Sequence, residues 1–349
     1  MLTQRLLRTW LLLLLLVAVS PLQVRAQKDA RELTIAFYNV ENFFDLEDDP
    51  AFEDEEYLPT GEKQWNAEKY QKKLQEIRRV LSAIPPEGKL PAMLGMCEVE
   101  TAAVARDIVE QLPGGENYRV VLIDSRYHRG VDVALAYDPS LLKHIRSVAY
   151  PTRPIAEHPD WYSRDILQVD GVLPSGDTLS VFVNHWPSRR NEESARIAVA
   201  SKLRAVIDSI RNESPQRGIL VMGDLNDEPH NMSVKDYLSE GGAAENAPEQ
   251  RLYNLMGLPA GDPDLGTYCY HGNWNMLDNM LISLNMLPQS KTFGLRAERE
   301  EGVVFNPEFV QQQGGDYDGY PNRTFAGRKY LAGPSDHFAI YARFILYTE

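Results

Sequence analysis

The sequence predicts an α/β fold. Short apolar runs typical of buried strands alternate with longer segments in which apolar residues recur at helical spacing, and this alternation indicates sheets layered against helices. Polar side chains follow directly after several of the apolar runs. Because strand ends gather at one edge of such a fold and the loops there carry function, the sequence also predicts a site at that edge.

Residues 1–26 are predicted to be a secretory signal peptide. Arg5 and Arg8 precede an apolar run from Trp10 to Val19, and Val24-Arg25-Ala26 supplies small residues at the cleavage positions. The run is too short for a membrane span, and no cysteine follows it as a lipid attachment point. We therefore expect a periplasmic or extracellular protein without a stable membrane anchor, in which residues 27–349 form a single domain.

The composition limits the partners of this chain. Its formal net charge is −14, and loss of Arg5, Arg8 and Arg25 with the leader would lower that charge by three, to −17. So acidic a chain is not a general polyanion binder, since phosphate neutralisation needs clustered Lys and Arg, and any work on nucleic acid must be local and metal-assisted. Cys97 and Cys269 could pair in an oxidising compartment, but a buried free thiol is as compatible with the apolar run around Cys97.

Apolar runs, some of them alternating with polar residues, are predicted to be strands. In chain order they span residues 33–39, 92–97, 119–123, 131–137, 166–169, 179–183, 219–222, 267–270, 280–282 and 338–346. The runs at 119–123 and 131–137 are typical of a hairpin. Those at 267–270 and 280–282 are predicted to pair through a turn at 271–273.

Amphipathic helices are predicted between these strands. Apolar residues recur at helical spacing from Tyr70 to Ile84, where Pro85-Pro86 ends the helix, and again from Ile197 to Ile210. The acidic segment 45–56 lacks a recognisable spacing of calcium ligands and is predicted to be a solvated loop. The long polar insertion 296–334 is more typical of a substrate-facing loop than of filler.

Side chains suited to a cation or a phosphate lie at or beside the predicted strand ends. They are Asn39, Glu98, His185, Asp224, Asn226, Asp278, Asp336 and His337. Alternation along an extended backbone would aim Asp224 and Asn226 at one spot. Carboxylates with amides, and no Cys-His cluster, favour Mg²⁺, Mn²⁺ or Ca²⁺ over a structural zinc. Two histidines beside acids can stabilise or protonate a phosphoryl oxygen.

Other motifs narrow the chemistry further. The sequence contains no Gly-Lys-Ser/Thr phosphate loop, no Gly-x-Ser-x-Gly elbow and no dinucleotide fingerprint, which argues against three common enzyme classes. Arg129, Arg164 and Arg323 are candidate contacts to a substrate phosphate, because guanidinium groups suit phosphate geometry. Otherwise Arg129 belongs to a solvated hairpin tip, and Arg164 is predicted to lie in a polar loop.

Together the strand-end motifs resemble those of the endonuclease/exonuclease/phosphatase family. The matching segments follow the family order: Tyr38-Asn39-Val40-Glu41, Glu98, His185, Gly223-Asp224-Leu225-Asn226, Leu277-Asp278 and Ser335-Asp336-His337. The resemblance spans almost all of the chain after the leader. It implies a four-layer α/β sandwich, two mixed β-sheets packed face to face with helices on the outside, and hydrolysis of a phosphoester by in-line attack of water with one or two divalent ions.

The resemblance also implies a metal site. Glu98 resembles the principal metal ligand, with Asn39, Glu41 and Asp336 near the ion. The ion would be Mg²⁺ or Mn²⁺, with Ca²⁺ as a further candidate.

The remaining matched residues resemble the catalytic groups of the family. Asp224 resembles the residue that orients or deprotonates the attacking water, with Asn226 as the amide beside it. His337 resembles the histidine that contacts the scissile phosphate, and Asp278 the acid that holds it. His185 resembles the second histidine of the deoxyribonuclease branch.

Several functions stay open at this point. A nuclease or general phosphodiesterase is the first expectation, acting as a monomer on a phosphoester substrate, with DNA or RNA bound weakly. The alternative is a sphingomyelinase- or phosphatase-type enzyme acting on lipid or small phosphorylated substrates. The inositol 5-phosphatase branch is disfavoured, since Asp227-Glu228-Pro229 and Met276–Asn279 depart from its pattern. A remote alternative is a non-catalytic binding protein on the same fold.

Overall fold

The computed structural model describes residues 29–86, 88–155, 158, 160–239 and 251–348. Residues 30–348 belong to one unit of the fold. The predicted signal peptide lies outside the described residues, as do residues 240–250 of a loop-like stretch. Within the described part of the chain, no helix is both long and apolar enough to span a bilayer.

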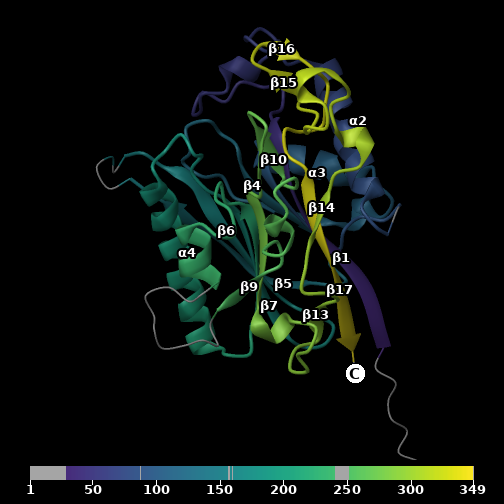
Figure 1. Ribbon diagram of the computed structural model, residues 1–349, viewed down its shortest axis with the longest axis vertical. Coiled ribbons are helices and arrows are strands. Elements are labelled where there is room, and N and C mark those ends of the chain that lie inside the picture. Colours follow the sequence, from purple (N-terminus) through teal and green to yellow (C-terminus); the bar gives the residue numbers. More distant parts are fainter. Residues whose placement is uncertain (1–28, 87, 156–157, 159, 240–250, 349) are drawn as a thin grey trace, which may run out of the picture. The chain divides into compact units, whose positions relative to one another are not determined.

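The first sheet is mixed and has seven strands (Figure 1). Its order is β13-β17-β1-β2-β4-β3, with β14 also paired to β17. The strands are β1 (Asp29–Phe43), β2 (Met93–Val99), β3 (Arg119–Leu122), β4 (Asp132–Tyr137), β13 (Leu295–Ala297), β14 (Val303–Phe305) and β17 (Ala339–Thr348). Strands β1 and β2 run parallel, whereas β2 and β4 are antiparallel.

The second sheet is also mixed and has six strands in the order β5-β6-β7-β8-β12-β9. They are β5 (Lys143–Thr152), β6 (Ser163–Val172), β7 (Thr178–His185), β8 (Gly218–Asp224), β9 (Leu252–Asn254) and β12 (Asp278–Ser283). Strands β7 and β8 run parallel, and β12 lies antiparallel to β8. These three neighbouring strands end in residues of the predicted site.

Strand β8 shows how the layers pack, because it is apolar on both of its faces. Leu220 and Met222 belong to the core shared with the first sheet, whereas Ile219 and Val221 pack with the helix on the other side. This alternation follows from the period of two in a strand. The sheets approach closely at Gly95 of β2, where an added Cβ would lie 2.4 Å from Sδ of Met222.

Helices cover the outer faces of both sheets. The first sheet is covered by α2 (Ala67–Ala83) and α3 (Ala102–Glu110), which Figure 1 shows on the side away from α4. The second is covered by α4 (Glu193–Glu213), followed by the short α5 (Met232–Val234). Asn66 and Thr101 cap α2 and α3 by accepting hydrogen bonds from backbone N–H groups of the first turn. The result is a four-layer α/β sandwich, which confirms the predicted fold class.

Short elements complete the described chain. They are η1 (Glu55–Tyr57), η2 (Gly115–Asn117), η3 (Lys235–Ser239), η5 (Pro259–Gly261), β10 (Tyr268–Tyr270), β11 (Asn273–Asn275), η6 (Leu284–Met286), η7 (Glu308–Val310), η8 (Gly315–Tyr317), β15 (Phe325–Ala326) and β16 (Lys329–Tyr330). The sequence pattern missed α3, β5 and β9. The predicted insertion 296–334 is folded around β14, β15 and β16 rather than being an open loop.

One predicted strand pairing is wrong. The strand β10 pairs with β11 through a tight turn at His271 and Gly272, both with positive φ, as two-residue hairpins require. The run at 280–282 instead lies in β12, between β8 and β9 of the second sheet. A fully apolar run of this kind suits a central strand buried on both faces.

Replacing Gly223 by Ala should destabilise the pairing of β7 with β8. A Cβ at this position would lie 2.3 Å from the carbonyl oxygen of Asn184 on the neighbouring strand, and backbone cannot move aside as a side chain can. We expect G223A to lower the free energy of unfolding by about 1–3 kcal/mol in denaturant titrations.

The matched control is Gly261→Ala, since an added Cβ there meets nothing within 4 Å. That variant should stay within about 0.5 kcal/mol of the parent protein. Equal stability of the two variants would contradict the close strand approach.

Candidate active site

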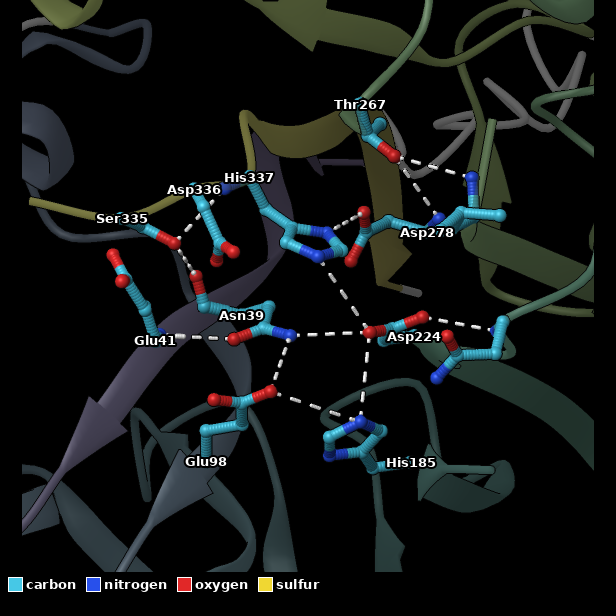
Figure 2. A network of polar contacts seen from close by, with 12 residues as sticks. Asn39, Glu41, Glu98, His185, Asp224, Thr267, Asp278, Ser335, Asp336 and His337 are labelled. Carbon is cyan, nitrogen blue, oxygen red and sulfur yellow. Dashed lines mark hydrogen bonds and ion pairs between the residues drawn. The ribbon is translucent and has the colours of Figure 1, made fainter. Parts of the chain in front are cut away.

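The side-chain amide of Asn39 contacts two carboxylates, one from each sheet (Figure 2). Nδ2 of Asn39 donates to Oε1 of Glu98 over 3.2 Å and to Oδ2 of Asp224 over 3.1 Å. Asn39 and Glu98 come from the paired strands β1 and β2, and Asp224 ends β8 of the other sheet. Segments far apart in the sequence therefore converge at this point.

Irregular backbone aims Glu98 at this point. The register between β1 and β2 shifts after Asn39, and Glu41, Asn42 and Glu98 adopt positive φ of 48°, 47° and 62°. Such bulges re-aim side chains, and strained non-glycine residues cluster at functional sites. As a result, the backbone N–H of Asn42 donates to Oε2 of Glu98 over 2.8 Å.

Strand register places His185 and Asp278 beside Asp224, and His337 reaches them from the segment before β17. In the second sheet His185 is the direct partner of Asp224 on one side, and Asp278 is its partner on the other. Nε2 of His185 lies 3.5 Å from Oδ2 of Asp224. Nδ1 of His337 lies 2.7 Å from Oδ2 of Asp278, and its Nε2 lies 3.8 Å from Oδ2 of Asp224.

Asn226 is positioned differently from the prediction. Strand β8 ends at Asp224, and Asn226 has a positive φ of 50°, so alternation along a strand cannot aim both side chains at one spot. The backbone N–H of Asn226 donates to Oδ1 of Asp224 over 2.9 Å, and its Nδ2 donates to the carbonyl of Trp186 over 3.0 Å. The residue supports Asp224 through the backbone.

The segment before β17 closes the other side of the site. Oγ of Ser335 donates to the carbonyl of Asn39 over 2.6 Å and accepts the N–H of His337 over 3.1 Å. Asp336 pairs with Arg323 over 3.1 Å. Figure 2 shows Glu41 and Asp336 on this side, next to Asn39. The structure thus brings together all of the predicted metal and catalytic residues.

Burial controls the charges. It raises the pKa of Asp224 to about 7, with the charge of Asp278 adding to the effect of burial. Burial lowers the pKa of His337, but the carboxylates of Asp278 and Asp224 outweigh it and hold that pKa well above its usual range. Burial, helped by the charge of Arg164, keeps the pKa of His185 well below its usual range. Burial and the neighbouring charges thus favour the protonated form of His337 and the neutral form of His185.

The donor set fits a hard cation. Glu98 and Asp224 share an uncharged amide, and in the described part of the chain no Lys or Arg lies within ion-pair distance of either. Potential ligand atoms of Asp224, Asp278 and His337, and of Cys97, His185 and Asp224, lie within 4.8 Å of one another. Carboxylate oxygens suit Mg²⁺ or Mn²⁺, whereas burial raises the pKa of the Cys97 thiol, which opposes a thiolate ligand.

The three predicted phosphate-binding arginines differ in their partners. Arg129 donates to the side-chain oxygen of Asn42, and Arg323 pairs with Asp336. Arg164 is only 6% exposed and lies in β6 rather than in the predicted loop, because the strand begins three residues earlier than expected. Its guanidinium stacks on Tyr127 at 4.0 Å, and among the described residues no carboxylate is within ion-pair distance of it.

Some residues that lie at the site were not predicted from the sequence. Oγ1 of Thr267 accepts the N–H of Asp278 over 3.2 Å, and the ring of Tyr268 lies 5.0 Å from that of His337. Lys73 of α2 is fully buried beneath Glu41. The burial of Lys73 could have been predicted from its position within the apolar stripe of its helix.

Cys97 and Cys269, which could have paired, are both buried free thiols.

The comparisons with known proteins identify the family. The model of the Endonuclease/Exonuclease/phosphatase family matches residues 34–345, so the chain belongs to this family. Its members hydrolyse phosphoester bonds and depend on a divalent metal, and this chain is accordingly an enzyme of the phosphoester-hydrolysing class. None of the curated proteins compared with the sequence matches it.

Solved structures share the fold at low sequence identity. Truncated TDP2 from Caenorhabditis elegans is 12% identical with a TM-score of 0.55, covering 90% of this chain and 97% of that one. The human Nocturnin catalytic domain with bound sulfate is 15% identical with a TM-score of 0.51, and the match covers 92% of this chain and 98% of that one. A mannosyl-6-phosphatase from Bacteroides thetaiotaomicron is 13% identical with a TM-score of 0.53, and the match covers 89% of this chain and 99% of that one. At these identities the similarity shows the fold alone.

Replacing Asp278 by Asn should lower the pKa of His337, because the neutral amide no longer stabilises the imidazolium at 2.7 Å. NMR titration of the imidazole in metal-free protein measures this change. The exposed Asp264→Asn serves as control and should leave the titration unchanged. An unaltered pKa in D278N would show that Asp278 does not hold the charge of His337.

Proposed function

We propose that the protein is an exported, divalent-metal-dependent phosphodiesterase, with nuclease activity as the first expectation. The observation that carries this proposal is the meeting of Glu98, Asp224 and His337 around Asn39 from both sheets. Export rests on the charged and apolar pattern of residues 1–26. We expect residues 27–349 to act as a single catalytic domain and a monomer.

Glu98 would be the principal ligand of Mg²⁺ or Mn²⁺, with Ca²⁺ as a further candidate. Asn39, Glu41 and Asp336 would lie near the ion, and Asn39 orients the carboxylates of Glu98 and Asp224 by donating to both. When bound, the ion would neutralise developing charge on a phosphoryl oxygen.

Asp224 would orient water and accept its proton. Its Oδ1 is held by the N–H of Asn226, and a pKa of about 7 suits a base that works near neutral pH. His337 can donate from Nε2 to a phosphoryl oxygen, since Asp278 holds Nδ1 and favours the imidazolium. His185 stands on the opposite side of Asp224 and, being neutral, can accept or donate a single hydrogen bond there.

Arg164 favours a second candidate, a phosphatase acting on small phosphorylated substrates. No carboxylate of the described residues lies within ion-pair distance of this buried guanidinium, which suits an anionic ligand, and a terminal phosphate carries more charge than a diester. Arg129 and Arg323 would contact the same or a neighbouring phosphate. A panel of duplex DNA, single-stranded DNA, RNA, sphingomyelin, phosphoinositides and phosphorylated sugars, with the metal varied, separates the two candidates.

Chelation should abolish hydrolysis of an activated phosphodiester such as bis(p-nitrophenyl) phosphate, and Mg²⁺ or Mn²⁺ should restore it. The reason is that Glu98 and Asp224 have no cationic side chain of Lys or Arg to balance them in the described structure. Release of p-nitrophenol measures the rate. Unchanged turnover in chelator would refute the metal role.

Alanine at Asp224 or His337 should lower kcat by about 10²-fold or more, because both groups act on the transition state. Steady-state kinetics, with circular dichroism to verify folding, measures the effect. The exposed Asp264→Ala is the control and should keep wild-type kcat. An effect confined to KM would remove Asp224 and His337 from the chemistry.

A further inference from the structure

A fully buried lysine lies beneath the site. Lys73 sits on the core-facing side of α2, beside Tyr70, Leu74 and Ile77, with no exposed surface. Its Nζ donates to the backbone carbonyl of Glu41 and, over 2.6 Å, to Oγ1 of Thr324. Burying an ammonium group costs free energy unless the group donates hydrogen bonds, so Lys73 is expected to keep Glu41 and Thr324 in contact with it.

The carboxylate of Glu41 is bound to backbone. Oε2 accepts the N–H of Thr324 over 2.6 Å, and Oε1 accepts the N–H of Phe325 over 3.4 Å. The side chain is 6% exposed. Both oxygens therefore contact the insertion between β14 and β17.

The left-handed turn at Glu41 and Asn42 explains this direction. It lets the N–H of Asn42 reach Glu98 while the side chain of Glu41 reaches Thr324, whose sequence position is 283 residues away. Neighbouring residues of β1 thus serve different partners, one at the centre of the site and one in the insertion.

Thr324 in turn organises the segment that leads to His337. Its Oγ1 donates to the carbonyl of Gly333 over 3.0 Å, and its own carbonyl accepts the N–H of Leu331 over 2.9 Å. The adjacent Arg323 pairs with Asp336 at the site. The hydrogen bonds of Thr324 therefore anchor the backbone directly beside Arg323.

We propose that Lys73, Glu41 and Thr324 form a clasp that positions Arg323 for substrate, and that Glu41 is a positioning residue rather than a metal ligand. This inference rests on the proposed function for its kinetic consequence. The charge distribution agrees with it. Lys73 donates to the backbone carbonyl of Glu41, and Asp336 is paired with Arg323, whereas among the described residues no Lys or Arg lies within ion-pair distance of Glu98 or Asp224.

The test uses Glu41→Gln, Thr324→Val and the double variant in the full protein. Thr324→Val keeps the shape of the side chain and removes the hydroxyl between Lys73 and Gly333, whereas a change at Lys73 itself risks the fold. Lys72→Met is the matched control, because Lys72 neighbours Lys73 on α2 but its side chain is 46% exposed.

Both single variants should speed amide hydrogen exchange in residues 322–333 and raise KM for the phosphoester by about tenfold, the scale of one displaced charged contact. The Mn²⁺ concentration for half-maximal activity should stay within about twofold, and the double variant should be no worse than the more damaging single one. K72M should match the parent protein in every measurement.

Two results would overturn the clasp. In the first, E41Q raises the Mn²⁺ requirement at least about tenfold, the effect of losing even a supporting group of a metal ligand, while T324V changes nothing. In the second, exchange or KM stays at the parent value, or the effects of the two variants add. Hydrogen exchange needs no turnover, so it decides the clasp even if the parent protein hydrolyses none of the substrates, which would instead count against the proposed function.

Discussion

The pair of hydrogen bonds from Asn39 to Glu98 and Asp224 is the interaction on which the site depends. It is made between strands of different sheets, so it exists only because the sheets pack face to face at the spacing that their apolar faces set. The uncharged amide holds the carboxylates of Glu98 and Asp224 close together without supplying a positive charge. Among the described residues no Lys or Arg lies within ion-pair distance of either carboxylate, so a divalent cation would add to the positive charge that His337 provides beside Asp224.

Strand register does the rest of the alignment. The parallel pairing of β7 with β8 and the antiparallel pairing of β12 with β8 put His185, Asp224 and Asp278 in one row across the second sheet. His337 reaches this row from the end of the insertion through its bond to Asp278. Rigid strands thus hold the groups assigned to chemistry, while the segment before β17 brings Arg323 and Asp336. This division is common where a scaffold stays constant and loops decide the substrate.

Where the prediction from sequence failed, a long-range contact had decided the outcome. Asn226 was expected to point with Asp224, but the strand ends at Asp224, two residues before Asn226, and the side-chain amide of Asn226 donates to the carbonyl of Trp186. The run at 280–282 was assigned to its neighbour in sequence, whereas pairing with β8 and β9 buries both of its faces. Arg164 was placed in a loop because polar residues surround it, yet it lies within β6 and stacks on Tyr127.

The sequence by itself determined the α/β layering, the strand-end position of most site residues and the oxygen-rich chemistry of the site, because periodicity and residue type are local properties. Only the tertiary structure decided which acids have no Lys or Arg within ion-pair distance among the described residues, that burial and nearby charges favour the protonated form of His337 and the neutral form of His185, and that Glu41 faces the insertion. Those properties depend on burial and on partners far apart in the chain, such as Glu41 with Thr324 and Asn39 with Asp224. No spacing along the sequence encodes them.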